Sequence, residues 1–220
     1  MIAKREKKIN KVVVGLDEAG RGAWAGPVAT AAVSVADHRI LDELVLSFLS
    51  YSNLKNKDVL LRDSKLLSPK KRDEIFEIIT NNSNINWSVS FIDSKTIDEI
   101  NIWQATVLGW KKCLDKLPCR PDLVLVDGHM TIPNLTIKQK PVINGDTKIA
   151  VISLASIIAK VSRDRFMQKM DEKYVNYGFD RHKGYGVKLH QERLVVYGPC
   201  DIHRKSFKPI ANIIEQYDSN

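Results

Sequence analysis

The chain has few cysteines and no long apolar run. Its 220 residues include three cysteines, Cys113, Cys119 and Cys200, and no two of them form a CxxC pair. This odd, widely spaced set argues against a disulfide framework and a structural zinc site, and it favours a reducing cytoplasm. No segment approaches the ~18 uninterrupted apolar residues that a membrane span needs. The lysine-rich start leads into no apolar stretch of the secretory type, so we expect no signal peptide.

Charged residues are abundant, and basic residues moderately outnumber acidic ones. The sequence holds 34 Lys and Arg against 26 Asp and Glu, a formal net charge of +8, and 44 % of its residues are hydrophobic. This composition is typical of a soluble globular protein and excludes a disordered one. The basic excess favours a polyanionic partner but does not specify a chemistry. A chain of this length can bury a full core as one large domain, with or without a C-terminal appendage.

Apolar periodicity predicts an α/β core followed by a mostly helical last third. Strands are expected over residues 12–16, 28–35, 85–91 and 123–126, with a further short apolar run at 141–143. Helices are expected to begin at Pro69 after a Ser68 cap, at the capping box of Thr96 and Glu99, and at residues 150, 188 and 210. The apolar positions of 38–50 fit a short helix, and 51–58 form a polar loop. Trp103 and Trp110 share one helical stripe and are expected in the core.

Acidic residues follow the apolar strands. Asp17 and Glu18 come after the first expected strand, Asp127 after the fourth, and Asp146 after the run at 141–143. Each one alone is commonly a turn or cap residue. Strand ends of one sheet converge, however, and like charges gathered there need a cation between them. Oxygen-only ligands fit Mg²⁺ or Mn²⁺, and four acids around two such ions support the attack of water on a phosphodiester.

A glycine-rich string directly after the first acid pair is the most specific signal. Residues 17–22 read DEAGRG and are followed by GPV at 26–28, a spacing that matches neither a Walker loop nor a dinucleotide fingerprint. The string strongly resembles the N-terminal signature of bacterial ribonuclease HII. The resemblance continues through DSK at 63–65, VDG at 126–128, GD at 145–146, ASIIAKVSRDR at 155–165, HKGYG at 182–186, YGP at 197–199 and HRKSF at 203–207.

The resemblance implies a ribonuclease H-like fold, a mixed sheet flanked by helices with a helical C-terminal extension. We expect a catalytic domain over residues 1–175 and an extension over 176–220 that completes the substrate-binding groove. The implied activity is that of a nuclease using two Mg²⁺ or Mn²⁺ ions. It would hydrolyse the RNA strand of RNA–DNA hybrids and cut 5′ to ribonucleotides embedded in duplex DNA, leaving 5′-phosphate and 3′-hydroxyl ends. By family likeness we expect a cytoplasmic monomer with no membrane partner.

The resemblance also assigns roles to individual residues. Asp17, Glu18, Asp127 and Asp146 match the catalytic, metal-binding acids. Gly20, Arg21 and Gly22 match the residues that sense the ribose 2′-hydroxyl, and Tyr185 matches a residue that stacks on the sugar of the following deoxynucleotide. Lys65, inside a matched motif, is expected to contact substrate. Asn144 departs from the lysine frequent at that position, and residues 37–62 exceed the usual spacing, which indicates a surface insertion.

Some assignments stay open. Asp164 competes with Asp146 as the fourth acid, although a salt bridge to a neighbouring arginine is its simpler role. Arg163 and Arg165, like Lys160 and Lys183, fit phosphate contacts and a solvated basic helix face equally well. His182 and His203 lack metal-ligand spacing and are expected to hydrogen-bond backbone or phosphate.

Two other functions compete with the ribonuclease. A resolvase-type DNA nuclease of the same superfamily would use the same acids, but a loop that senses a 2′-hydroxyl has no purpose on DNA alone. A non-catalytic basic nucleic-acid-binding module would explain the net charge, yet it leaves the four acids at an anion-binding surface unexplained.

Overall fold

The computed structural model describes residues 11–36 and 67–218. A mixed sheet of five strands lies at its centre, in the order β3–β2–β1–β4–β5. The first three strands pair antiparallel, and the last two join β1 in parallel. The strands are β1 (Val13–Ala19), β2 (Val28–Val35), β3 (Ile85–Ile92), β4 (Leu123–Asp127) and β5 (Gln139–Val142).

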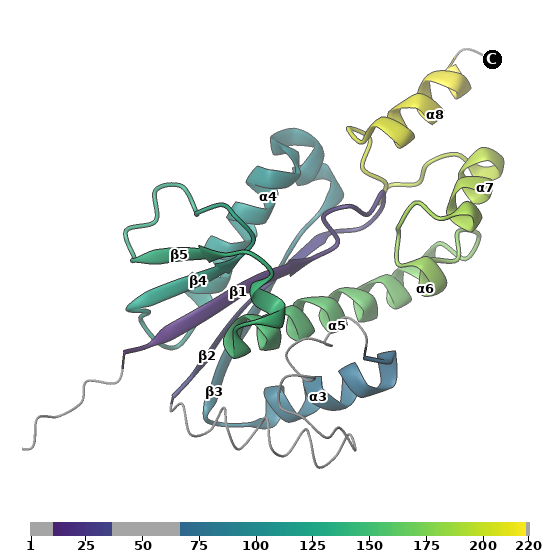
Figure 1. Cartoon of the computed structure of the whole chain (residues 1–220). Coiled ribbons are helices and arrows are strands. Elements are labelled where there is room, and N and C mark those ends of the chain that lie inside the picture. The colour runs from purple at the N-terminus through teal and green to yellow at the C-terminus, as the bar shows by residue number, and fades with distance from the viewer. Residues whose placement is uncertain (1–10, 37–66, 219–220) are drawn as a thin grey trace, which may run out of the picture.

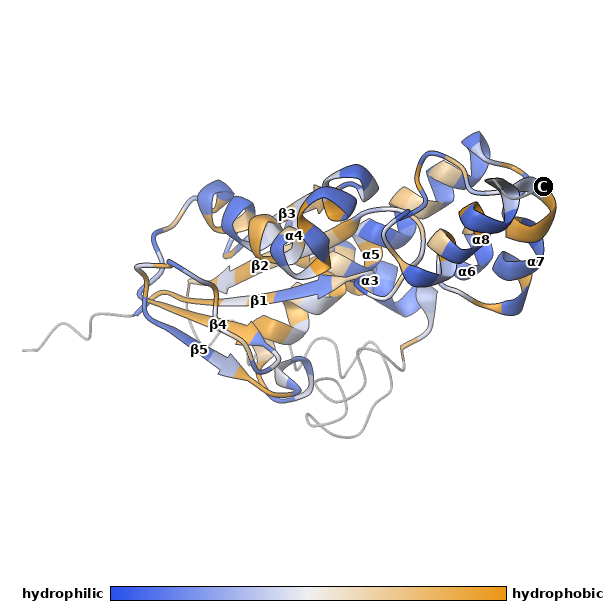
Figure 2. Ribbon diagram, turned by 90° about the horizontal axis from the view of Figure 1, so that it is seen from above, coloured by the Kyte–Doolittle hydropathy of each residue, from blue (hydrophilic) through white to orange (hydrophobic). Residues whose placement is uncertain are grey.

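Helices cover both faces of the sheet (Figure 1). Helix α4 (Ser94–Lys116) packs on one face. Helix α5 (Ala150–Lys173) packs on the other, beside α3 (Pro69–Asn81), which also contacts β3. Three further helices gather beyond one end of the sheet, as Figure 2 shows from above: α6 (Phe179–His182), α7 (Lys188–Tyr197) and α8 (Lys208–Asp218).

Alternation along β1 explains why two helices sandwich it. Val14 and Leu16 belong to the apolar cluster that includes Trp110 of α4. Gly15, between them, faces α5 so closely that a Cβ there would lie 2.4 Å from the backbone carbonyl carbon of Val151. The missing side chain lets the first turn of α5 rest directly on the strand that carries the acidic pair.

The structure confirms the α/β class, the mixed sheet and the helical C-terminal segment. It corrects the end of the first strand, because β2 stays paired with β1 as far as Ala19. Asp17 and Glu18 therefore lie inside β1 rather than after it. The predicted start of α7 at residue 188 is confirmed, whereas the short α6 was not predicted and α8 begins at Lys208 rather than at residue 210.

Helix α4 begins earlier than its predicted capping box. Asp93 is the N-cap, and its Oδ1 accepts a hydrogen bond from the Thr96 backbone N–H at 2.7 Å. The helix is also broken at Asn101, which has φ 66°. Trp110 is 1 % exposed, as predicted for the core, whereas Trp103 is only half-buried.

Part of the prediction lies outside the described residues. This applies to the helix over 38–50, the loop over 51–58, the insertion over 37–62 and Lys65. None of the helices in the described ranges is both long and apolar enough to cross a membrane.

Candidate active site

The parallel register of β1 and β4 brings two acidic residues side by side. Leu16 pairs with Val126, so the next residues along the two strands are Asp17 and Asp127. Adjacent residues of paired strands present their side chains to the same face. Asp17 is 4 % exposed, and its Oδ1 accepts a hydrogen bond from the Glu18 backbone N–H at 2.7 Å.

The surroundings of Asp17 raise its pKa well above the ordinary value. Burial is the largest cause, followed by the negative charges of Glu18 and then Asp127, while hydrogen bonds from the Glu18 backbone and the Ser156 side chain oppose the rise. A divalent cation would stabilise the ionised form of such a carboxyl group.

The donor set fits Mg²⁺ or Mn²⁺ by its chemistry. Every candidate ligand is a carboxylate oxygen, which these hard ions prefer. In the described ranges, no three His, Cys, Asp or Glu side chains already stand together as ligands of one ion. The fit therefore rests on the oxygen donors and on the negative charge concentrated around Asp17.

Asp146 is tied to the same strand end through Asp127. The chain leaves β5 through Asn144, in the left-handed conformation with φ 54°, into the short 3-10 turn Gly145–Thr147. The backbone N–H groups of Gly145 and Asp146 donate to Asp127 Oδ1 at 2.7 and 3.4 Å. Asp146 is 1 % exposed. Asn144 thus has a conformational role, since asparagine tolerates this backbone geometry better than most residues.

Asp164 lies elsewhere. It sits eight residues from Ser156, roughly 12 Å along α5. Its Oδ1 accepts from Lys160 Nζ at 2.7 Å, so its ion pair is with a lysine and not with the arginine expected from the sequence. The structure therefore brings Asp146, and not Asp164, to the acidic pair on β1 and β4.

A cavity of about 460 Å³ opens beside these acids. Glu18 is the one of the four that lines it, and its Oε1 accepts from Arg21 Nη1 at 3.3 Å. Arg21 also lies over the Trp103 ring, 5.8 Å from its centroid. The lining comes from β1 and its following loop, α3, α5 and the turn after α6: Glu18, Ala19, Gly20, Arg21, Gly22, Arg72, Ser156, Ile157, Lys160 and Tyr185.

The two outer glycines of the Gly-Arg-Gly string differ in their surroundings. Gly20 has φ +92°, and a Cβ there would lie 1.9 Å from Arg163 Nε. Gly22 is exposed, and a Cβ there would meet no described atom within 4 Å. Glycine at position 20 is therefore required by the fold, whereas glycine at position 22 leaves open space beside the cavity.

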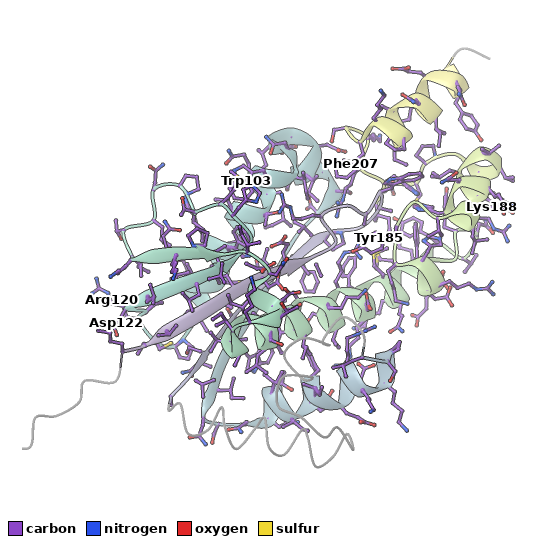
Figure 3. All side chains as sticks on the ribbon, in the orientation of Figure 1. Trp103, Arg120, Asp122, Tyr185, Lys188 and Phe207 are labelled. Atoms are coloured by element: carbon purple, nitrogen blue, oxygen red, sulfur yellow. The ribbon has the colours of Figure 1, made fainter. Side chains whose placement is uncertain are left out.

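Tyr185 lines the cavity, is 36 % exposed and lies next to the loop after β1 (Figure 3). Its flanking glycines, Gly184 and Gly186, are required by close packing. A Cβ at Gly184 would lie 2.4 Å from the Ala25 carbonyl oxygen, and one at Gly186 would lie 2.2 Å from the Trp24 ring. These close approaches hold the Tyr185 turn against the glycine-rich loop.

The basic residues divide into three groups. Arg163 is 0 % exposed and contacts neither solvent nor an external phosphate, so both sequence-based interpretations are wrong for it. Arg165 is ion-paired to Asp73 and Glu77, both at 2.9 Å. Lys160 and Arg72 line the cavity. Arg72 and the buried Arg204 were not identified from the sequence, because nothing in a local pattern distinguishes them from other surface arginines.

His182 and His203 hydrogen-bond backbone groups, as expected. His182 Nδ1 accepts from the Gly184 backbone N–H at 3.1 Å, and His203 Nδ1 accepts from the Cys200 backbone N–H at 2.8 Å. Both are buried, so they bind backbone rather than phosphate.

Comparison with known proteins gives one consistent family. The family model described as Ribonuclease HII matches residues 14–210. A curated ribonuclease HII from Caldicellulosiruptor bescii is 48 % identical over 205 residues, covering 92 % of this chain and 90 % of the relative. A ribonuclease HII from Coxiella burnetii is 40 % identical over 204 residues, covering 93 % and 92 %.

Solved structures agree in fold. The ribonuclease H2 of Pyrococcus horikoshii superimposes with a TM-score of 0.73 at 26 % identity, covering 95 % of this chain and all of that one. A Bst ribonuclease HIII solved in complex with Mn²⁺ superimposes with a TM-score of 0.68 at 15 % identity, covering 96 % of this chain and 71 % of that one. The second likeness concerns the fold alone.

Proposed function

This chain belongs to the ribonuclease HII family, and from its site we propose how it acts. It is a metal-dependent endonuclease that hydrolyses the RNA strand of RNA–DNA hybrids. It also cuts 5′ to ribonucleotides embedded in duplex DNA and leaves 5′-phosphate and 3′-hydroxyl ends. The observation that carries the proposal is the convergence of Asp17 and Asp127 through the β1–β4 register, with Asp146 hydrogen-bonded to Asp127.

In this proposal the four acidic residues would bind the metal ions, and the glycine-rich loop after β1 would select a ribose in the substrate. Asp17, Glu18, Asp127 and Asp146 would hold two Mg²⁺ or Mn²⁺ ions, and such ions would supply a water of lowered pKa and positive charge to offset that of the leaving oxygen. Asp127 additionally fixes the turn that carries Asp146.

Substrate recognition falls to residues at the cavity. Gly20, Arg21 and Gly22 contact the 2′-hydroxyl, so a ribose is required where the chain is cut. Tyr185 stacks on the sugar of the next deoxynucleotide, and Lys65, outside the described residues, is a further substrate contact. The C-terminal segment contributes Tyr185 to the cavity, which supports a groove completed by residues 176–220. Monomeric state and cytoplasmic location stay predictions of the sequence.

A cleavage assay on matched duplexes tests the activity. We expect cutting of a DNA duplex that carries one ribonucleotide, in Mg²⁺ or Mn²⁺, and no cutting of its all-DNA twin or in the presence of a chelator. Equal cutting of both duplexes would favour a resolvase-type nuclease. Binding without cleavage in any divalent metal would favour a non-catalytic module.

The variant Asp17→Asn tests the acidic centre. We expect the cleavage rate to fall by on the order of a hundredfold or more, because several kcal/mol of transition-state stabilisation are lost. We also expect the melting temperature at pH 7 to stay equal or rise, because a buried carboxyl with a raised pKa destabilises the fold when it is ionised. The control is Glu192→Gln on α7, whose carboxylate lies 3.8 Å from Lys188. Near wild-type cleavage by Asp17→Asn would refute the site.

A further inference from the structure

Two arginines are buried behind the glycine-rich loop without a carboxylate partner. Arg163 of α5 and Arg204 of the segment before α8 are both 0 % exposed. Neither forms an ion pair with a carboxylate of the described residues. Burial lowers the pKa of both, that of Arg204 to about 9. Since an unpaired buried cation is destabilising, what these side chains bind needs an explanation.

Both guanidinium groups bind carbonyl oxygens of the same loop. Arg163 donates through Nε to Pro27 O at 2.9 Å and through Nη2 to Ala25 O at 3.1 Å. Arg204 donates through Nε to Gly26 O at 3.0 Å and through Nη1 to Arg21 O at 2.9 Å. Four of the loop carbonyls are thereby drawn towards the interior of the protein.

The Arg204 contact fixes a peptide plane at the centre of the Gly-Arg-Gly string. No described peptide bond is cis, so the carbonyl of Arg21 and the N–H of Gly22 point in opposite directions. Because Arg204 holds the carbonyl inward, the N–H of Gly22 points outward. Gly22 is exposed and lines the cavity, where its N–H is available to a ligand.

Arg163 connects this loop to Tyr185. Its Nη1 donates to the Lys183 carbonyl at 2.9 Å, and its guanidinium carbon lies 5.4 Å from the centroid of the Tyr185 ring. The same side chain fills the space where Gly20 would carry a Cβ. One buried cation therefore contacts both elements that the proposed function assigns to substrate recognition.

We propose that Arg163 and Arg204 are positioning residues that set the selectivity for ribose, Arg204 by turning the Gly22 amide towards the substrate and Arg163 by locking the loop to Tyr185. The inference rests on the proposed function. Arginine is needed because its planar fork binds two carbonyl groups at fixed angles, which a lysine ammonium group does not reproduce.

The test replaces each arginine by lysine and measures kcat and KM on two substrates, a duplex with one ribonucleotide and a long RNA–DNA hybrid. Arg204→Lys is expected to lower kcat on both substrates by about tenfold or more with little change in KM. A shift of the Gly22 amide by about 1 Å would misplace the substrate enough to cause such a loss of rate. Arg163→Lys is expected to lower cleavage of the single-ribonucleotide duplex about tenfold more than cleavage of the hybrid. The matched control is Arg165→Lys, because Arg165 lies two residues further along α5 and is ion-paired at the surface. Its kcat and KM on both substrates should equal those of the wild type.

A double-mutant cycle separates positioning from general stability. Tyr185→Ala should change the ratio of the two cleavage rates in the wild type but not in Arg163→Lys, because the arginine acts through the tyrosine. Additive effects, or wild-type ratios and kcat in both lysine variants, would overturn the inference. A lysine variant that is unfolded at the assay temperature also counts against it, since the arginine would then hold the whole fold rather than the loop.

The controls distinguish this failure from failure of the proposed function. If the wild type cuts the all-DNA twin as fast as the ribonucleotide duplex, the proposed function is wrong and the inference falls with it. If the wild type is selective and both lysine variants keep its kcat and its ratio of the two cleavage rates, only the inference is wrong.

Discussion

At the scale of single residues, side chains that do chemistry are easier to find than side chains that position them. Asp17 and Asp127 stand out in the sequence because carboxylates next to apolar strands need an explanation. Arg163 looks like any other basic residue of a long helix. Two of its acceptors are backbone carbonyls 136 and 138 residues away, and only the folded chain brings them to it.

The two glycines of the loop give a prediction at this scale. Gly22→Ala should leave the free energy of unfolding unchanged or raise it by up to about 1 kcal/mol, because nothing obstructs the added methyl group and alanine lowers the entropy of the unfolded chain. It should nevertheless slow cleavage of a ribonucleotide duplex by about tenfold, because the methyl group stands where the substrate backbone must approach. Urea unfolding and initial cleavage rates measure the two quantities.

Gly20→Ala is the matched comparison for Gly22→Ala. It combines a positive φ with a collision against Arg163, so it should lose about 1–2 kcal/mol of stability as well as activity. If Gly22→Ala were as destabilised as Gly20→Ala, or as active as the wild type, the open space at position 22 would have no role in binding.

At the scale of elements, the sequence predicts existence and type better than boundaries. Helix α4 shows why: Thr96 with Glu99 has the spacing of a capping box, but Asp93 precedes it and caps the helix instead. The apolar stripe of α4 also hides the break at Asn101, because hydrophobic spacing on either side stays close to helical. Strand β1 extends to Ala19 because β2 pairs with it that far, and this pairing cannot be predicted from the apolar run, which ends at Leu16.

The break in α4 predicts a specific order of stabilities. Asn101 Oδ1 accepts from the backbone N–H groups of Trp103 and Gln104, both at 3.0 Å, and so caps the second half of the helix. Asn101→Ala should lose about 1–2 kcal/mol, because it removes the cap and places alanine at φ 66°. Asn101→Gly should lose only a few tenths, because glycine accepts this φ. Equal losses in urea unfolding would contradict the role of the cap.

At the scale of the whole molecule, the C-terminal segment is held by a buried group of histidines. The His182 and His190 rings stack with centroids 4.4 Å apart, and His190 Nε2 lies 2.9 Å from His203 Nε2. These contacts join α6, α7 and the segment that carries Arg204. The sequence did not predict these histidine contacts, because the three histidines are spread over 22 positions and come together only when the helices pack.

The histidine group predicts how stability depends on pH. Burial, followed by the neighbouring histidines, lowers the pKa of His190 to about 3, and burial lowers that of His203 to about 4, both from 6.5. Below pH 6.5 the unfolded chain therefore binds more protons than the folded one. Stability is fully present above that pH and falls as the pH falls, by about 1.4 kcal/mol per pH unit for each histidine. Asp17, whose pKa is raised, has the opposite effect on stability, because its contribution to the free energy of unfolding increases as the pH falls.

The difference in the free energy of unfolding between the wild type and His190→Gln isolates the effect of the histidine, because both chains contain Asp17 and its contribution cancels. His190→Gln should be less stable than the wild type at pH 7.5, since it loses the packing and hydrogen bonds of the ring. The gap in the free energy of unfolding should narrow towards pH 5, where the wild type must keep a buried histidine neutral and the variant need not. The control is His129→Gln, at an exposed histidine outside the buried group. A His190→Gln gap that is constant or widens on acidification would show that the buried histidine is not the group that opposes protonation.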